Sequence, residues 1–181
     1  MDSTTKNIDV IGYHGTDGDS VREINIRGFK LLNSNPSNWL GDGVYFFQSV
    51  KDMDIDGFKE AESWAKRTAK YVNSKSYGVF EARIKSGKVF DSYGKREHRI
   101  LFWKIKHRLE SVYKGDLLID QRVYLILREK YSFELFRILA DGRKIKYPSY
   151  TIERPQVIIC IKNLECIKEK KLIKQGEFYG R

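Results

Sequence analysis

Cysteine and histidine are scarce in this sequence, which limits the metal sites that it can form. The two cysteines, Cys160 and Cys166, lack the paired spacing of a structural zinc site. The three histidines, His14, His98 and His107, are not spaced as metal ligands either. We expect His98 and His107 on the surface of a basic helix, and we predict no metal cofactor.

Long apolar runs are also missing. No stretch of about 18 apolar residues is present, so no transmembrane helix and no membrane partner are expected. Residues 1–7 are polar and do not resemble a secretory signal. Because unpaired cysteines suit a reducing compartment, we expect a cytoplasmic protein. The sequence shows no internal repeat, and its 181 residues fit a single domain, 1–181.

Positive charge, in contrast, is abundant. The chain has 34 Lys and Arg against 24 Asp and Glu, which gives a net charge of +10. A field of this sign speeds encounter with anions such as a nucleic acid, a nucleotide cofactor or an acidic protein. A basic protein without such a partner remains the alternative.

Two short motifs stand out. The first, Gly12-Tyr13-His14-Gly15-Thr16, ends an apolar β-branched run, and the glycine after His14 would let a ligand approach the backbone. The second, WLGDGVYFF at 39–47, enters an aromatic strand through two glycines. Strand alternation sends Tyr45 and Phe47 to one face. We therefore expect the Tyr45 ring beside His14, under a loop at 30–43 that covers a ligand held by both.

Local signals predict the elements around these motifs. We expect a strand at 8–13, then a short helix that begins with a capping box of Ser20 and Glu23 and ends at Gly28. Apolar residues at helical spacing predict a helix at 56–73. Strands are expected at 77–84 and 88–91, joined as a hairpin by Ser86-Gly87.

The middle of the chain, 92–149, reads as a helical insertion. A strongly basic helix is expected at 95–114, followed by helices at 120–130 and 132–140 and a basic patch at 143–146. A solvated face is the simpler interpretation of the basic helix. The functional interpretation is a phosphate-contacting surface on which Trp103 and Tyr113 stack against exposed bases.

The C-terminal part holds the clearest strand. Pro155 opens the apolar run 156–161, which is typical of a central strand covered on both faces. A final edge strand is expected at 164–167, and the lysine-rich residues 168–181 are expected to fray.

Taken together, the strand-end His-Gly-Thr, the short helix closed by Arg27-Gly28-Phe29 and the Gly-Val-Tyr-Phe-Phe strand resemble the diphtheria-toxin and poly(ADP-ribose) polymerase branch of the ADP-ribosyltransferases. The resemblance covers roughly 8–91 and 150–167. It implies an α+β fold of split, mostly antiparallel sheets surrounded by helices, with NAD bound in the cleft between the sheets.

The resemblance also implies roles for single residues. His14 would bond a hydroxyl of the adenosine ribose, Gly15 backbone groups would bind the carboxamide, Thr16 would assist, and Tyr45 would stack on the nicotinamide. The family's third residue is a glutamate that opens a late strand, but Gln156 stands there. A glutamine accepts a hydrogen bond but is no general base. Glu153, three residues earlier, is the nearest carboxylate, and an ordinary structural role for Gln156 stays open.

These observations predict an NAD-dependent mono-ADP-ribosyltransferase. Its small size resembles the toxins of toxin–antitoxin or phage-defence systems, which implies an antitoxin partner. The basic charge favours single-stranded RNA or DNA as the acceptor. A protein acceptor, a non-catalytic module that binds NAD or ADP-ribose, and a plain nucleic-acid-binding protein are the alternatives.

Overall fold

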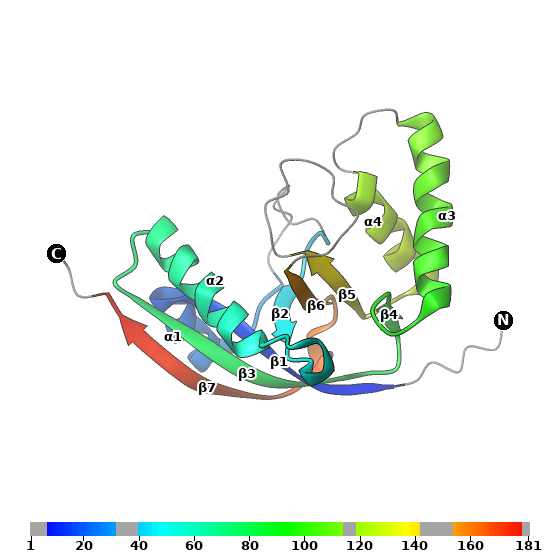
Figure 1. The fold of residues 1–181 in the computed structure, drawn as a ribbon. Coiled ribbons are helices and arrows are strands. Elements are labelled where there is room, and N and C mark those ends of the chain that lie inside the picture. The colour runs from blue at the N-terminus through cyan, green and yellow to red at the C-terminus, as the bar shows by residue number, and fades with distance from the viewer. Residues whose placement is uncertain (1–6, 32–39, 114–118, 142–153, 179–181) are drawn as a thin grey trace.

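The computed structural model describes residues 7–31, 40–113, 119–141 and 154–178. Within them the chain forms a seven-stranded mixed sheet and four α-helices (Figure 1). The strands are β1 (Ile8–Asp17), β2 (Val44–Gln48), β3 (Ser76–Ser86), β4 (Val89–Asp91), β5 (Leu135–Asp141), β6 (Pro155–Ile161) and β7 (Ile167–Glu177). The helices are α1 (Gly18–Arg27), α2 (Gly57–Tyr71), α3 (Arg96–Val112) and α4 (Ile119–Tyr131), with 3-10 turns at Lys51–Met53 and Leu164–Cys166. The expected α+β class is confirmed.

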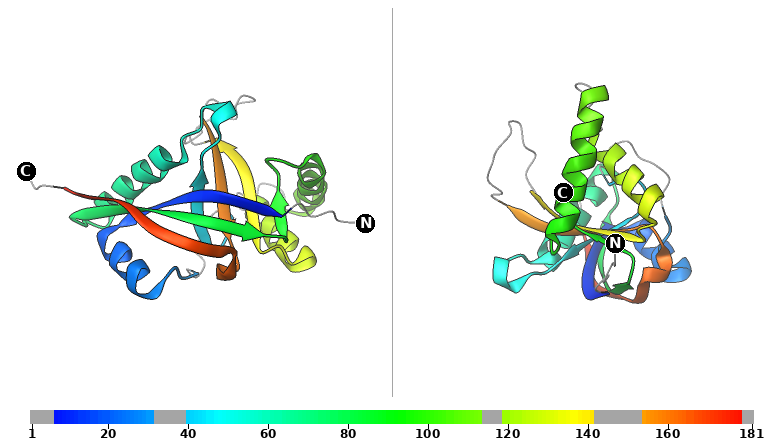
Figure 2. Two further views of the ribbon diagram at one scale, coloured as in Figure 1. Left: turned by 90° about the horizontal axis from the view of Figure 1, so that it is seen from below. Right: turned by 90° about the vertical axis from the view of Figure 1, so that its right-hand side faces the viewer.

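The sheet consists of two halves that meet at one point. Its strand order is β4-β5-β6-β2-β1-β3-β7, and every pairing is antiparallel except that of β4 with β5. β1 pairs with β3 along its whole length. Among the described residues, it pairs with β2 only at Tyr13, which lies opposite Phe47. Figure 2 shows the strands of the β1-β3-β7 half running across those of the β2-β6-β5-β4 half.

Apolar side chains from both halves meet in one core cluster. The cluster takes residues from β1 and β3, from β2, β4, β5 and β6, and from α1, so each half covers the other and α1 covers both. Its members include Ile8, Val21, Ile24, Phe46, Phe80, Ile84, Leu135, Ile159 and Ile161. A second cluster lies where α3 and α4 cover β4, β5 and β6, and it includes Phe90, Val123, Leu127, Phe136 and Ile158.

Helix α2 bridges the break between the halves. Its buried residues are Gly57, Ala61, Ala65 and Ala69, a stripe of small residues at a spacing of four. A Cβ built on Gly57 would meet the backbone at the end of β2, 2.7 Å from the Ser49 nitrogen. Small side chains therefore let the helix backbone lie directly on the ends of β1 and β2.

Five of the predicted elements are wrong or shifted, among them the strand at 8–13, which continues to Asp17. The strands at 77–84 and 88–91 do not form a hairpin, because β4 pairs in parallel with β5. The helix expected at 132–140 is β5, an interior strand whose Leu135, Phe136 and Ile138 are buried. In this short apolar run, pairing on both sides outweighs the helical pattern. The segment 92–149 is thus helical only in part, and its basic patch at 143–146 lies outside the described residues.

The other two differences concern element ends. Asp17, not Ser20, caps α1, so the predicted capping box does not form. The chain makes a 3-10 turn from Leu164 and then the 11-residue strand β7, which pairs with β3 where fraying was expected. Most β7 side chains are exposed lysines and other polar groups, which is typical of an edge strand.

Candidate functional site

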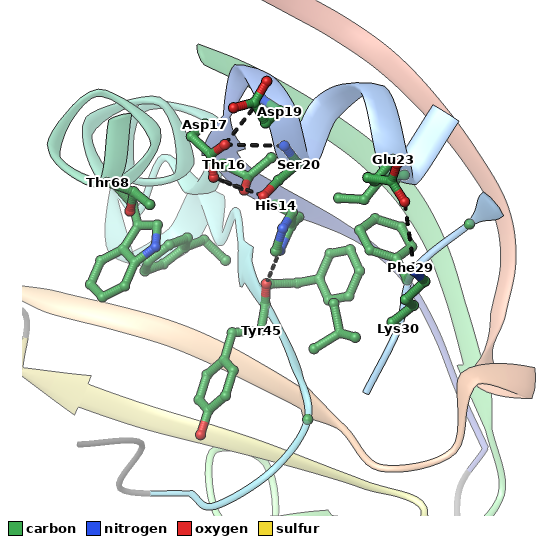
Figure 3. Close-up of a pocket in the computed structure, with 18 of the residues that line it drawn as sticks. His14, Thr16, Asp17, Asp19, Ser20, Glu23, Phe29, Lys30, Tyr45 and Thr68 are labelled. Carbon is green, nitrogen blue, oxygen red and sulfur yellow. Dashed lines mark hydrogen bonds and ion pairs between the residues drawn. The ribbon is translucent and has the colours of Figure 1, made fainter. Parts of the chain in front are cut away.

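A pocket of about 590 Å³ opens where β1 and β2 diverge beyond Tyr13 and Phe47 (Figure 3). Its wall combines residues of β1, α1, β2, α2 and β6. The lining includes His14 to Asp17 on β1, Asp19, Ser20 and Glu23 on α1, Phe29 and Lys30 after it, Tyr45 to Phe47 on β2, Trp64 and Thr68 on α2, and Ile158 on β6. The break in the sheet is thus what creates the space.

His14 is fixed at this break by a backbone contact. Its Nδ1 lies 2.8 Å from the carbonyl oxygen of Tyr45, and its ring packs edge-on against Phe29. Because a carbonyl only accepts, Nδ1 carries the proton and Nε2 of the neutral ring is an acceptor. Burial lowers the pKa of His14, although the Tyr45 carbonyl and Asp17 oppose the shift. The ring is therefore held neutral near pH 7, with an acceptor to offer a ligand hydroxyl.

The Tyr45 ring does not lie beside His14 as expected. Only the Tyr45 carbonyl faces the imidazole, while the ring extends away from it (Figure 3). The phenol donates a hydrogen bond to the Gly41 carbonyl at 2.7 Å, and the ring packs against the second core cluster. Burial raises the pKa of Tyr45. The structure brings the two residues together, but through the backbone of Tyr45.

Gly15 is required for helix packing. A Cβ on Gly15 would lie 1.8 Å from the Ala61 carbonyl oxygen, so only glycine lets α2 rest on β1 here. We expected the space beside this glycine to admit a ligand, but on the α2 side the helix backbone fills it. Its backbone still lines the pocket.

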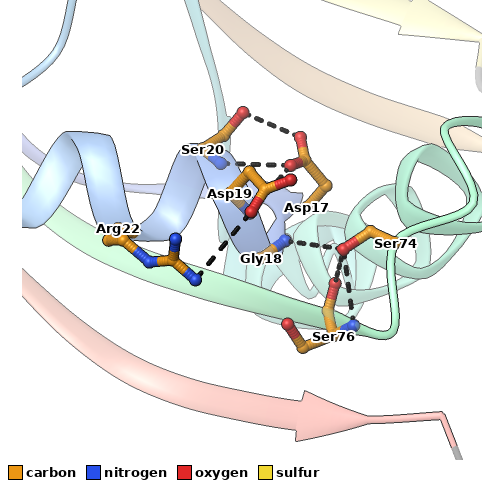
Figure 4. A network of polar contacts seen from close by, with 7 residues as sticks. All are labelled: Asp17, Gly18, Asp19, Ser20, Arg22, Ser74 and Ser76. Atoms are coloured by element: carbon orange, nitrogen blue, oxygen red, sulfur yellow. Dashed lines mark hydrogen bonds and ion pairs between the residues drawn. The ribbon is translucent and has the colours of Figure 1, made fainter.

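Asp17 belongs to a polar network at the start of α1 (Figure 4). Asp17 Oδ1 accepts from the amides of Asp19 and Ser20 at 3.1 and 3.0 Å, and its Oδ2 accepts from the Ser20 hydroxyl at 2.7 Å. Burial favours the neutral acid, but the Ser20 and Asp19 hydrogen bonds outweigh it and lower the pKa of Asp17. Thr16 is buried and donates to Asp17 Oδ2 at 3.4 Å. The network fixes α1 on the pocket wall.

Gln156 does not lie in the pocket wall, and Glu153 lies outside the described residues. Gln156 is buried at the start of β6, and its Nε2 donates to the carboxylate of Glu60 on α2. It shares a face of β6 with Ile158, which does line the pocket. The predicted third residue therefore lies two residues before the pocket wall on β6, in contact with a carboxylate that the motif did not include.

Three residues of α2 at or near the pocket, Glu60, Trp64 and Thr68, were not identified from the sequence. They repeat every four residues, so they form one flank of α2 beside its small-residue stripe. Trp64 and Thr68 line the pocket, and the Trp64 side chain is 49% exposed. The spacing was visible, but it did not reveal that this flank faces β6 and the pocket.

The basic helix α3 is largely solvent-facing. It has no fully buried residue, and Trp103 is 51% exposed with Lys106 Nζ 5.1 Å from its ring centre. His107 is exposed as expected. His98 is not, because its ring stacks on Phe90 and its Nδ1 accepts from the Asp91 amide at 2.8 Å.

Comparison with known proteins gives no functional name. No protein-family model matches the chain. The chain is 25% identical over 187 residues to an uncharacterized protein of Methanocaldococcus jannaschii, an alignment that covers 87% of this chain and 84% of that protein. Among the described helices, none has both the length and the apolar character needed to span a bilayer. Within the same residues, no group of three or more His, Cys, Asp or Glu side chains is placed to hold a metal ion.

Proposed function

We propose that this protein is an NAD-dependent mono-ADP-ribosyltransferase that modifies a single-stranded nucleic acid. The observation that carries the proposal is the neutral His14 at the break between β1 and β2, held by the Tyr45 carbonyl with Nε2 as a hydrogen-bond acceptor. The His-Gly-Thr and aromatic-strand motifs thus meet at one pocket.

The pocket suits a dinucleotide in size and chemistry. Its volume of about 590 Å³ falls within the range of small-molecule sites. Carboxylates of Asp19 and Glu23 on the α1 wall would accept hydrogen bonds from ribose hydroxyls, and their charge, with that of Asp17, favours a cationic nicotinamide ring. On the α2 wall, Trp64 offers a half-exposed aromatic ring with Arg67 over it. Because the Tyr45 ring points elsewhere, Trp64 is the better candidate for stacking.

The proposed acceptor rests on α3. Exposed cations such as Arg96, Lys104 and Arg108 flank the half-exposed Trp103 on this helix. Cations that contact backbone phosphates, next to an aromatic ring on which an unpaired base stacks, are typical of single-strand binding. The further role as a cytoplasmic toxin with an antitoxin partner rests on the family resemblance alone.

The test is transfer of label from NAD. Purified protein is incubated with labelled NAD and, separately, total RNA, single-stranded DNA or lysate proteins, with His14→Ala in parallel. We expect label on a nucleic acid, at least 100-fold less in the variant. Label on protein alone would support the transferase activity but contradict a nucleic acid as the acceptor. NAD binding without nicotinamide release would identify a non-catalytic module.

A further inference from the structure

Helix α2 carries a glutamate on each side of its small-residue stripe. Glu62 lies on the side of β3, where it accepts a hydrogen bond from the Tyr77 hydroxyl at 3.1 Å and pairs with Lys66 at 3.0 Å. Glu60 lies on the side of β6, where it contacts Gln156 and Arg154. Each carboxylate thus has one neutral donor and one cation as partners, but the two lie on opposite sides of the helix.

Glu60 is held in one orientation by donors on two sides. Arg154 Nη2 lies 2.7 Å from its Oε1 and 2.9 Å from its Oε2, and the Gln156 amide donates to Oε2. The Glu60 side chain is 16% exposed, whereas that of Arg154 is 53% exposed. Glu60 is therefore a fixed, largely enclosed carboxylate whose cationic partner borders solvent.

Residues on both elements that hold this carboxylate continue into the pocket wall. Trp64, one helical turn further along α2, lines the pocket, as does Ile158, two residues beyond Gln156 on β6. One helical turn corresponds to about 5.4 Å along the axis. The residue after Glu60 is Ala61, whose carbonyl oxygen packs against Gly15, the neighbour of His14. Glu60 therefore lies one helical turn before the pocket wall, and the residue after it packs on the motif that contains His14.

We propose that Glu60 supplies the reactive carboxylate of this site from α2, in place of a residue on the late strand. The inference rests on the transferase function proposed above. In that reaction the bond between the ribose C1′ and the nicotinamide nitrogen breaks, and its electron pair neutralises the nicotinamide ring. The oxocarbenium character left on the ribose is stabilised by a nearby negative charge. A lone pair of the acceptor then bonds to C1′, and the acceptor's proton passes to Glu60.

The assignment explains why glutamine suffices at position 156. The Gln156 amide nitrogen is a donor, so it holds an ionised partner in place. A glutamate at this position would bring a second negative charge against Glu60.

The test compares Glu60→Gln with Glu62→Gln, a matched control on the same helix whose side chain is 20% exposed. Nicotinamide release from NAD, NAD affinity and thermal unfolding are measured for both and for the unmodified protein. We expect release to fall about 100-fold or more in Glu60→Gln, as is typical on loss of an acid–base group. NAD affinity should stay within about twofold, and Glu62→Gln should retain full release.

Each other result contradicts a specific claim. If the unmodified protein releases nicotinamide and Glu60→Gln does so equally well, Glu60 has no chemical role and the proposed function stands. If release falls only in proportion to lost NAD affinity or lost folding, Glu60 is structural. If the unmodified protein binds NAD and never releases nicotinamide, the proposed function and this inference both fail.

Discussion

His14 shows how one side chain gains a chemical state from its surroundings. The sequence indicated that His14 lies close to Tyr45, because this follows from two short motifs, but it placed His14 at a strand end, whereas β1 continues through His14 to Asp17. It did not indicate the tautomer, which depends on a carbonyl 31 residues away. Nor did it indicate Glu60 beside Gln156, a contact between residues 96 positions apart that depends on how α2 crosses β6.

The lowered pKa of His14 predicts a pH dependence of stability. Because the folded pKa lies below the ordinary histidine value of 6.5, the unfolded state binds more protons as the pH falls through this region. The free energy of unfolding should therefore decrease between about pH 7 and pH 5.5. The decrease should be smaller in His14→Gln, measured by urea unfolding at each pH.

A second histidine serves as a comparison for that experiment. Burial, together with Lys95, also lowers the pKa of His98, so His98→Gln should remove a further part of the decrease. A pH dependence in His14→Gln equal to that of the unmodified protein would contradict the lowered pKa of His14.

At the scale of elements, the periodic segments were the predictable ones. Helices α1, α2 and α3 and strands β1, β2, β3 and β6 lie close to where the sequence placed them. The run 135–141 has the length and apolar content of either element, and its strand form is set by pairing with β4 and β6. The contact of α2 with the sheet could not be predicted either, because a stripe of alanines does not indicate which element it packs against.

Gly15→Ala tests that contact. The added Cβ would meet the Ala61 backbone, which cannot rotate away, so α2 must shift off β1. We expect a loss of about 2–3 kcal/mol of unfolding free energy, in the range of overpacked sites. The control is Gly87→Ala, where the new Cβ would meet only the tip of the Asn7 side chain. Equal stability of the two variants in denaturant unfolding would contradict the packing of α2.

At the scale of the whole molecule, two tryptophans mark two different surfaces. Trp64 lines the pocket, whereas Trp103 lies on the outward side of α3. They are almost equally exposed, at 49% and 51%, and each has a cation over its ring, Arg67 and Lys106 respectively. Substituting each tryptophan in turn therefore tests cofactor binding and acceptor binding separately, and the two substitutions should have similar effects on stability.

Trp64→Ala should weaken NAD binding and leave oligonucleotide binding unchanged, and Trp103→Ala should do the reverse. Loss of one stacking contact corresponds to about 1–3 kcal/mol. Calorimetry with NAD and filter binding with a labelled single-stranded oligonucleotide at two salt concentrations measure both effects. If both variants weaken the same ligand, the two surfaces are not separate sites.

The single pairing between β1 and β2 also means that hydrogen exchange can show whether the pocket holds a ligand. In an antiparallel ladder, successive amides point alternately to the two neighbouring strands. Beyond Tyr13, alternate amides of β1 therefore point away from β3 toward β2, with which these residues have no pairing in the described strands. Those N–H groups should exchange with solvent deuterium quickly, while their neighbours bonded to β3 are protected. A ligand that hydrogen-bonds to this edge would slow only the fast set, so isotope exchange along one strand would give both the presence of the ligand and its orientation.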